Sequence, residues 1–326
     1  MAGIYIHIPF CRQACAYCNF HFATSLRYKD DMVKAIAKEA EAEKQYLDGA
    51  PVQTIYFGGG TPSLLSIDEL RLLIADLHKN YPVSPDAEIT LEANPDDINE
   101  EMLKAWKDLG INRLSIGIQS FFQEELRWMN RAHNVQQSYQ CIEQSLNAGF
   151  NNFSIDLIYG SPLLTDEMWK QNVDTATAYG ITHLSCYALT VEEKTPLHKQ
   201  VRLQQKQDVE NSKQAHQFYL LMQWLREKGY EHYEVSNFAK PGYRSRHNSS
   251  YWKAIPYLGL GPSAHSYNGS ERRWNIPNNN IYMQSVNEGA AKRETEVLTA
   301  DQTLNEYIMI SLRTAEGIDL NKIDQS

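Results

Sequence analysis

Three cysteines within eight residues carry the clearest chemistry in this sequence. Cys11, Cys15 and Cys18 follow an alternating apolar segment at residues 3–8 and a proline at position 9. An alternating segment of this kind predicts a β-strand, so the three thiols should share one loop at its carboxyl end. Three thiols in so short a loop cannot all pair as disulfides. Because soft sulfur ligands select zinc or iron–sulfur clusters, the spacing Cys-x3-Cys-x2-Cys predicts one inorganic centre.

Two kinds of centre suit these cysteines. With His21 as a fourth ligand they would form a Cys3His set, which is typical of structural zinc sites. A chain of this length, however, buries enough surface to need no metal to stabilise its core. The alternative is a [4Fe-4S] cluster held by three cysteines where four are usual, which would leave one iron open to a small molecule.

Composition narrows the class of protein. The chain has 326 residues, of which 42% are hydrophobic and 22% charged, as in an ordinary globular protein. The 31 basic and 40 acidic residues give a net charge of −9, which argues against a nucleic-acid partner. The sequence has neither a transmembrane stretch nor a signal-peptide pattern, so we expect a cytoplasmic protein. In that compartment a cysteine cluster indicates metal binding or catalysis.

Strand and helix patterns alternate over the first 240 residues. We expect strands at 4–8, 52–57, 88–91, 113–118, 153–158 and 183–188, with helices between them at 28–46, 67–79, 99–109, 123–128, 136–148 and 167–178. Such alternation predicts right-handed βαβ units and a parallel sheet. Six units favour a partial (β/α)6 barrel over a doubly wound open sheet.

Three regions follow from this reading. Residues 1–240 form the barrel, and residues 241–300 are an extension rich in tyrosine and asparagine. Residues 230–285 are rich in Tyr, Asn, Pro, Gly and Ser, so we expect short strands and loops there. Residues 301–326 begin a helical carboxyl-terminal domain.

Polar residues stand where the expected strands end. Barrel chemistry gathers at the carboxyl ends of strands, and the second strand leads into Gly-Gly-Gly-Thr-Pro at 58–62, whose amides could approach a ligand. Glu92 and Gln119 end the third and fourth strands, and Asp156 lies within the fifth. A carboxylate in an apolar strand is costly unless it is paired or bound to a polar group. Each carboxylate alone suits a structural ion pair, but three polar residues on neighbouring strands predict a ligand site.

These motifs together resemble the radical S-adenosylmethionine (SAM) superfamily. The resemblance implies that Cys11, Cys15 and Cys18 hold a [4Fe-4S] cluster whose open iron chelates SAM, and that the reduced cluster cleaves SAM to a 5′-deoxyadenosyl radical. Within the superfamily, residues 5–11, 58–63, 117–121, 156–160 and 312–317 resemble the oxygen-independent coproporphyrinogen oxidase group. The cofactor-binding residues this resemblance implies are Tyr5, Tyr17, Gly59, Gly60, Thr61, Glu92, Gln119, Arg131 and Asp156.

Two branches of that group compete. The coproporphyrinogen III dehydrogenases carry a fourth cysteine two positions after the third and a long arm before the cluster. Here position 20 is Phe20, and only ten residues precede Cys11. The segment His-Asn-Ser-Ser-Tyr-Trp at 247–252 instead resembles the HNxxYW motif of the group's heme chaperones. That motif presents His247 as an exposed axial ligand beside aromatic surface, with His265 as the reserve candidate.

We therefore expect a chaperone that binds heme and transfers it to an acceptor protein not identified by the sequence. The alternative is oxidative decarboxylation of coproporphyrinogen III by the deoxyadenosyl radical, and a third interpretation is a zinc-stabilised barrel without radical chemistry. Members of the group continue for several dozen residues as a carboxyl-terminal helical domain. We expect this sequence to contain only the beginning of that domain.

Overall fold

Six parallel strands in chain order form the centre of one curved sheet. The computed structural model describes residues 1–324. The central strands are β1 (Ala2–Ile8), β2 (Val52–Gly59), β3 (Val83–Ala93), β4 (Arg113–Gln119), β5 (Phe153–Tyr159) and β6 (His183–Ala188). Their residues are largely buried, as expected of parallel strands that are covered on both faces. The predicted partial (β/α)6 barrel is confirmed.

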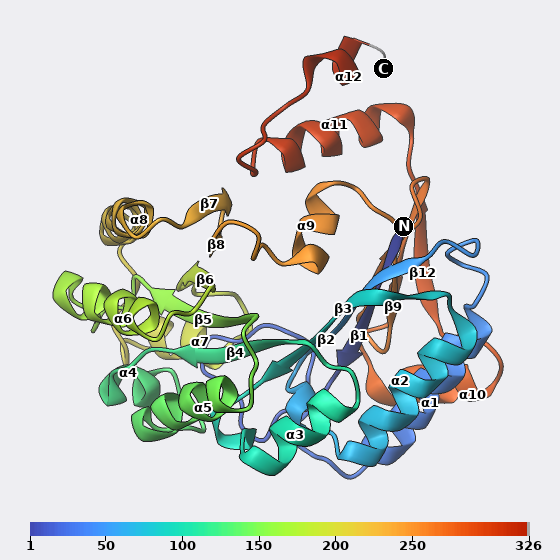
Figure 1. Ribbon diagram of the computed structural model, residues 1–326, viewed down its shortest axis with the longest axis horizontal. Helices are drawn as coiled ribbons and strands as arrows, with labels where there is room; N and C mark the ends of the chain where they lie inside the picture. The colour runs from blue at the N-terminus through green and yellow to red at the C-terminus, as the bar shows by residue number, and fades with distance from the viewer. Residues whose placement is uncertain (325–326) are drawn as a thin grey trace.

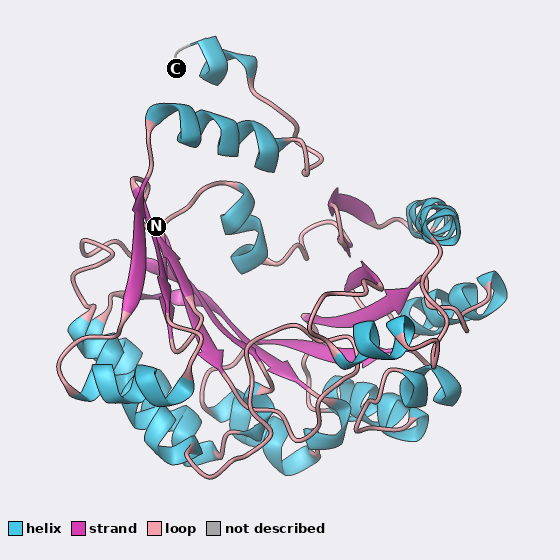
Figure 2. Ribbon diagram, turned by 180° about the vertical axis from the view of Figure 1, so that it is seen from behind, coloured by secondary structure: helices cyan, strands magenta, loops and turns pink. Residues whose placement is uncertain are grey.

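Six helices cross between these strands and cover the convex side of the sheet (Figures 1 and 2). They are α1 (Lys29–Ala42), α2 (Ile67–Asn80), α3 (Glu100–Asp108), α4 (Gln123–Trp128), α5 (Val135–Asn147) and α6 (Asp166–Ala178). Local sequence fixes their ends. Ser66 and Glu69 form a capping box at the start of α2, and Gly110, Gly149 and Gly180 adopt positive φ just after α3, α5 and α6.

The sheet continues beyond both edges of the barrel. Strand β9 (Tyr257–Leu260) pairs in parallel with β1, and β10 (His265–Tyr267), β11 (Glu271–Asn275) and β12 (Arg293–Val297) follow it in antiparallel pairs. At the other edge, β8 (Asn237–Ala239) and β7 (Glu231–Glu234) add two antiparallel strands after β6. The strands of residues 241–300 therefore continue the barrel's own sheet.

Helices interrupt the region expected to hold only short strands and loops. They are α9 (Arg246–Trp252) and α10 (Asn279–Asn287), so that expectation was wrong for these residues. Both are short and polar, but each begins at a residue whose side chain caps it, Ser245 for α9 and Asn278 for α10. Helix α9 lies on the concave side of the sheet, away from α1–α6 (Figures 1 and 2).

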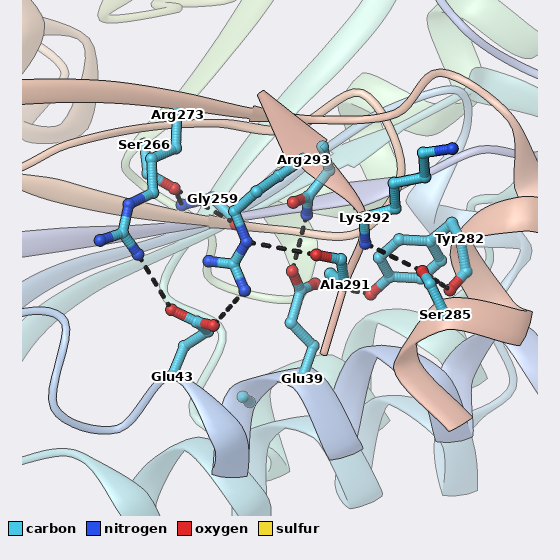
Figure 3. Close-up of polar contacts among 12 residues, drawn as sticks. Glu39, Glu43, Gly259, Ser266, Arg273, Tyr282, Ser285, Ala291, Lys292 and Arg293 are labelled. Carbon is cyan, nitrogen blue, oxygen red and sulfur yellow. Dashed lines mark hydrogen bonds and ion pairs between the residues drawn. The ribbon is translucent and has the colours of Figure 1, made fainter. Parts of the chain in front are cut away.

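A buried carboxylate fastens the extension to the barrel (Figure 3). Glu39 of α1 accepts hydrogen bonds from the Gly261 N–H (2.8 Å), the Asn275 Nδ2 (2.7 Å) and the Tyr282 hydroxyl (2.6 Å). Burial raises the pKa of Glu39 to about 7, although the three hydrogen bonds lower it in part. One turn later, Glu43 pairs with two arginines of the extension, Arg273 and Arg293.

The remaining helices follow the barrel and the extension. They are α7 (Pro196–Arg202), α8 (Asn211–Glu227), α11 (Ala300–Ser311) and α12 (Leu320–Asp324). Helices α11 and α12 stand beyond the end of β12, on the side of the sheet where the chain begins (Figure 1). Within the described residues, every helix is too short or too polar to cross a lipid bilayer. Cys141 and Cys186 are buried in α5 and β6 and pack as small core residues.

Candidate functional site

The loop between β1 and α1 presents the three thiols at the carboxyl end of the sheet. The Cys11 N–H donates to the Ala23 carbonyl (3.1 Å), which closes the loop on itself. The Ala16 N–H donates to the Met129 carbonyl (2.9 Å) and ties the loop to the segment after α4. All three cysteines of the loop are free thiols, and all three line one cavity of about 570 Å³.

The same cavity gathers almost every predicted cofactor contact. Its lining includes Tyr17, Gly59, Gly60, Thr61, Glu92, Gln119, Arg131 and Asp156. Tyr5 is the exception, because it does not line the cavity and lies behind Glu92, against Tyr56. The parallel register of the sheet explains the convergence, since strand ends far apart in the sequence meet at one edge.

A hydrogen-bonded chain joins two of the thiols across the cavity wall. The Arg131 Nη1 donates to the Cys15 Sγ (3.2 Å), and its Nη2 donates to the Asn94 Oδ1 (2.8 Å). Asn94 Nδ2 donates to the Thr61 Oγ1 (3.3 Å), and the Thr61 hydroxyl donates to the Cys11 Sγ (3.4 Å). A guanidinium and a hydroxyl aimed at sulfur favour the thiolate form that binds metal. Burial alone has the opposite effect and raises the pKa of Cys11 to about 11.

Two carboxyl groups face the cavity from β3 and β5. Glu92 accepts hydrogen bonds from the Tyr56 hydroxyl (2.8 Å) and the Gly59 N–H (3.2 Å). Burial raises the pKa of Glu92 to about 8, and the nearby charge of Asp156 adds to the increase. Burial likewise raises the pKa of Asp156 to about 6. Partly buried carboxyl groups with spare acceptor capacity suit a ligand that carries ammonium or hydroxyl groups.

Two glycines at the end of β2 have a packing role that the sequence did not reveal. Gly59 has a φ of +104°, and a Cβ there would lie 2.6 Å from the His7 Nδ1. A Cβ on Gly60 would lie 2.5 Å from the Phe10 carbonyl oxygen. Both positions therefore need glycine to let the end of β2 lie against the cysteine loop. Gln119 also takes the left-handed conformation, with a φ of 64°, as its strand turns at the cavity.

Sequence reasoning missed several residues of the cavity wall. Asn94, Ser115, Tyr187 and Leu189 line it beside the predicted contacts. Asn94 could have been predicted, because it is a polar residue directly after the strand that carries Glu92. Ser115 and Tyr187 lie inside β4 and β6, where nothing in the sequence distinguishes them from other strand residues.

The structure corrects the expectation that His247 is exposed. Its side chain is 2% exposed, and both ring nitrogens are hydrogen bonded, Nδ1 to the Thr54 hydroxyl and Nε2 to the Tyr251 hydroxyl, each at 2.8 Å. Burial lowers the pKa of His247 to about 3, so the ring is neutral. His265 differs: it is exposed, stacks on Trp274 with ring centroids 6.0 Å apart, and has no hydrogen-bond partner for its ring among the described residues.

The three thiols that line the cavity suit a metal cluster. Within residues 1–324, no three histidine, cysteine or acidic side chains converge on one point where a single metal ion could be held. His21, the fourth ligand of the zinc interpretation, is hydrogen bonded through its Nε2 to the Asn279 Oδ1 (2.7 Å). In a cluster each sulfur binds a different iron, so three thiols lining one cavity are sufficient.

A partial (β/α)6 barrel with three free cysteines in the loop after its first strand defines a radical SAM fold. The sequence model of the radical SAM superfamily matches residues 5–176. The chain belongs to this superfamily and, within it, to the group of the oxygen-independent coproporphyrinogen oxidases and their HemW relatives.

Individual relatives make the similarity more specific. The heme chaperone HemW of Mycobacterium tuberculosis (strain ATCC 25618 / H37Rv) is 34% identical over 327 residues, covering 98% of this chain and 84% of the relative. HemW of Synechocystis sp. is 35% identical, covering 96% and 78%. Among solved structures, the coproporphyrinogen III oxidase HemN of Escherichia coli, described as a radical SAM enzyme, superimposes with a TM-score of 0.86 at 25% identity, covering 99% of this chain and 78% of HemN.

Proposed function

We propose that this chain is a heme chaperone that holds a [4Fe-4S] cluster and SAM. Cys11, Cys15 and Cys18 would bind the cluster, which when reduced supplies an electron for SAM cleavage. Around it, the cavity offers Glu92 and Asp156 as acceptors for the amino and hydroxyl groups of SAM. The hydrogen-bonded Arg131 brings positive charge toward the thiolates. The observation that carries the proposal is the match to proteins named heme chaperone over nearly the whole chain.

Phe20 favours the chaperone over the decarboxylating enzyme. It lines the cavity beside the cluster loop and is 66% exposed. The dehydrogenase branch has a cysteine at the corresponding position, so Phe20 replaces a reactive thiol with an apolar ring. The likeness to HemN keeps oxidative decarboxylation of coproporphyrinogen III as the second candidate. We place the protein in the cytoplasm, where thiols stay reduced and available to the cluster.

Two histidines compete as the heme ligand. His247, in the HNSSYW segment, could coordinate iron only after its hydrogen bonds to Thr54 and Tyr251 break. His265 needs no such change, because its ring is exposed and stacked on the indole of Trp274. A neutral imidazole beside aromatic surface is a suitable axial ligand for heme.

The test uses the anaerobically purified protein with two substrates in parallel. Hemin titration should give a Soret shift that saturates, whereas coproporphyrinogen III should remain unchanged with SAM and reductant present. Turnover of coproporphyrinogen III to protoporphyrinogen IX would replace the chaperone proposal with the enzyme. His265→Ala and His247→Ala variants, titrated with hemin, then assign the ligand to the variant that loses the shift.

A further inference from the structure

Helix α9 is anchored to the inner face of the barrel through its first turn. The N–H groups of Arg246 and His247 donate to the Glu88 carboxylate at 3.2 and 3.0 Å. His247 and Tyr251 are one helical turn apart and bond to each other through the Nε2 and the hydroxyl. This anchoring points the His247 ring toward β1 and β2, where its Nδ1 meets Thr54.

The His247 ring packs onto two tyrosines of the central strands. Tyr56 stacks on it with ring centroids 5.0 Å apart and planes at 24°, and Tyr5 with centroids 6.5 Å apart and planes at 28°. Tyr5 and Tyr56 are register partners in β1 and β2 and stack on each other at 6.1 Å. The site is shaped for the imidazole, because a Cβ on Gly3 would lie 2.8 Å from the Thr54 Oγ1 and 3.4 Å from the His247 ring.

Tyr56 connects this stack to the cavity. Its hydroxyl donates to the Glu92 Oε1 at 2.8 Å, while the other carboxyl oxygen accepts the Gly59 N–H. We infer that His247 is a positioning residue of the SAM cavity: its ring holds Tyr56, and Tyr56 holds the Glu92 carboxyl group toward the ligand. This inference rests on SAM binding in the proposed function. It gives the histidine of the HNSSYW segment a role that does not require contact with heme.

Three substitutions separate this role from general stability. Tyr56→Phe removes the hydroxyl that holds Glu92, and His247→Ala removes the ring that supports Tyr56. Both should weaken SAM binding by about tenfold, because the Glu92 carboxyl group would no longer be held toward the ligand. His247→Phe keeps a ring against Tyr56 and should restore most of the affinity, although it leaves the Thr54 and Tyr251 hydroxyls unpaired and lowers stability.

Tyr282→Phe is the matched control. Tyr282 also donates its hydroxyl to a buried carboxylate, Glu39 (Figure 3), but neither residue lines the cavity. It should lose comparable stability and keep wild-type SAM affinity. The readouts are the iron content, the EPR signal of the reduced cluster without SAM, the SAM concentration that half-perturbs this signal, and the urea midpoint of unfolding.

The possible results distinguish a failure of this inference from a failure of the proposed function, which includes SAM binding. If wild-type protein binds SAM and Tyr56→Phe binds it as tightly as Tyr282→Phe does, His247 is not a positioning residue and the inference is wrong. Equal weakening by His247→Phe and His247→Ala would also contradict it. A wild-type cluster that SAM leaves unperturbed would overturn the proposed function itself, and the inference with it. If His247→Ala does not fold, His247→Phe takes its place: near wild-type SAM affinity supports the inference, and a loss equal to that of Tyr56→Phe contradicts it.

Discussion

At the scale of single residues, the thiols of the cluster loop differ in their surroundings. Cys11 receives the Thr61 hydroxyl and Cys15 receives the Arg131 guanidinium. Burial raises the pKa values of Cys11 and Cys18. Metal binding must displace these protons, so cluster assembly should be favoured by the donors around the sulfurs.

Removal of any cluster cysteine should abolish the iron–sulfur centre. Cys11→Ala, Cys15→Ala and Cys18→Ala should each lose the EPR signal of the reduced cluster after anaerobic reconstitution, because only three thiols are available to four irons. Cys141→Ala, which changes a buried core thiol in α5, should keep about four irons per chain. Stoichiometric zinc in place of iron in the wild-type protein would instead support the zinc interpretation.

The two cavity carboxyl groups should control SAM affinity without controlling the fold. Glu92→Ala and Asp156→Ala each remove an acceptor for a charged or hydroxyl-bearing ligand, at a cost of about 1.5–3 kcal/mol, or roughly tenfold to a hundredfold in affinity. The SAM dependence of the cluster EPR signal measures the effect, and circular dichroism checks the fold. Unfolded variants, or folded ones with wild-type affinity, would make these carboxyl groups structural.

Residue types and spacing were enough to predict much of this cavity. The cysteines, Glu92, Gln119 and Asp156 stood out because polar residues at the ends of apolar strands need a partner. The burial of His247 could not be predicted, because it depends on α9 packing against β1 and β2 from 190 residues away in the chain, as the bond to Thr54 shows. Tyr5 stacks on Tyr56 behind Glu92 and does not line the cavity, and its contact with SAM stays a prediction.

At the scale of elements, the six βα units were predictable and the sheet edges were not. The sequence around α2 predicts this helix through its apolar periodicity and its capping residue Ser66, and the apolar run of β5 predicts a strand. The pairing of β9 with β1 joins segments about 250 residues apart, and only the tertiary fold brings them together. The donors to Glu39 come from three separate parts of the extension. The burial of this carboxylate therefore cannot be predicted from the sequence around it.

Glu39 should make the stability of the protein depend on pH. Its folded pKa is raised to about 7 from 4.5, so the folded protein keeps a proton that the unfolded chain releases above pH 4.5. The free energy of unfolding should therefore fall as the pH rises from 4.5 to 7, and change no further through this group above that. Glu39→Gln should flatten this dependence in urea titrations, whereas Glu41→Gln, on the exposed side of the same helix, should not.

Removing the whole side chain of Glu39 tests how strongly it attaches the extension to the barrel. Glu39→Ala leaves the Gly261 N–H and the Tyr282 hydroxyl without an acceptor, whereas the Asn275 Nδ2 keeps its bond to the Gly261 carbonyl. With about 1–3 kcal/mol lost for each unpaired buried group, the variant should lose at least about 2 kcal/mol of stability. A loss below about 1 kcal/mol would mean that water or neighbouring groups replace the carboxylate.

At the scale of the whole molecule, the two candidate heme ligands have different consequences for SAM. His247 supports Tyr56 and Glu92 from inside the barrel, so an iron that captured its ring would also withdraw support from the SAM cavity. His265 lies on β10, two strands away from β1 in the extended sheet, where ligation leaves that stack intact. Because coupling between two sites is reciprocal, one measurement of SAM affinity reports which histidine binds heme.

We expect heme and SAM to bind independently. His265 is exposed and offers a free imidazole, whereas releasing His247 would break two hydrogen bonds and a ring stack. Saturating hemin should therefore change the SAM concentration that half-perturbs the cluster signal by less than about twofold, and His265→Ala should abolish the Soret shift. Weaker SAM binding in the presence of hemin, with the Soret shift retained in His265→Ala and lost in His247→Ala, would place His247 on the iron. The two sites would then be antagonistic, and heme loading would release SAM from the cavity.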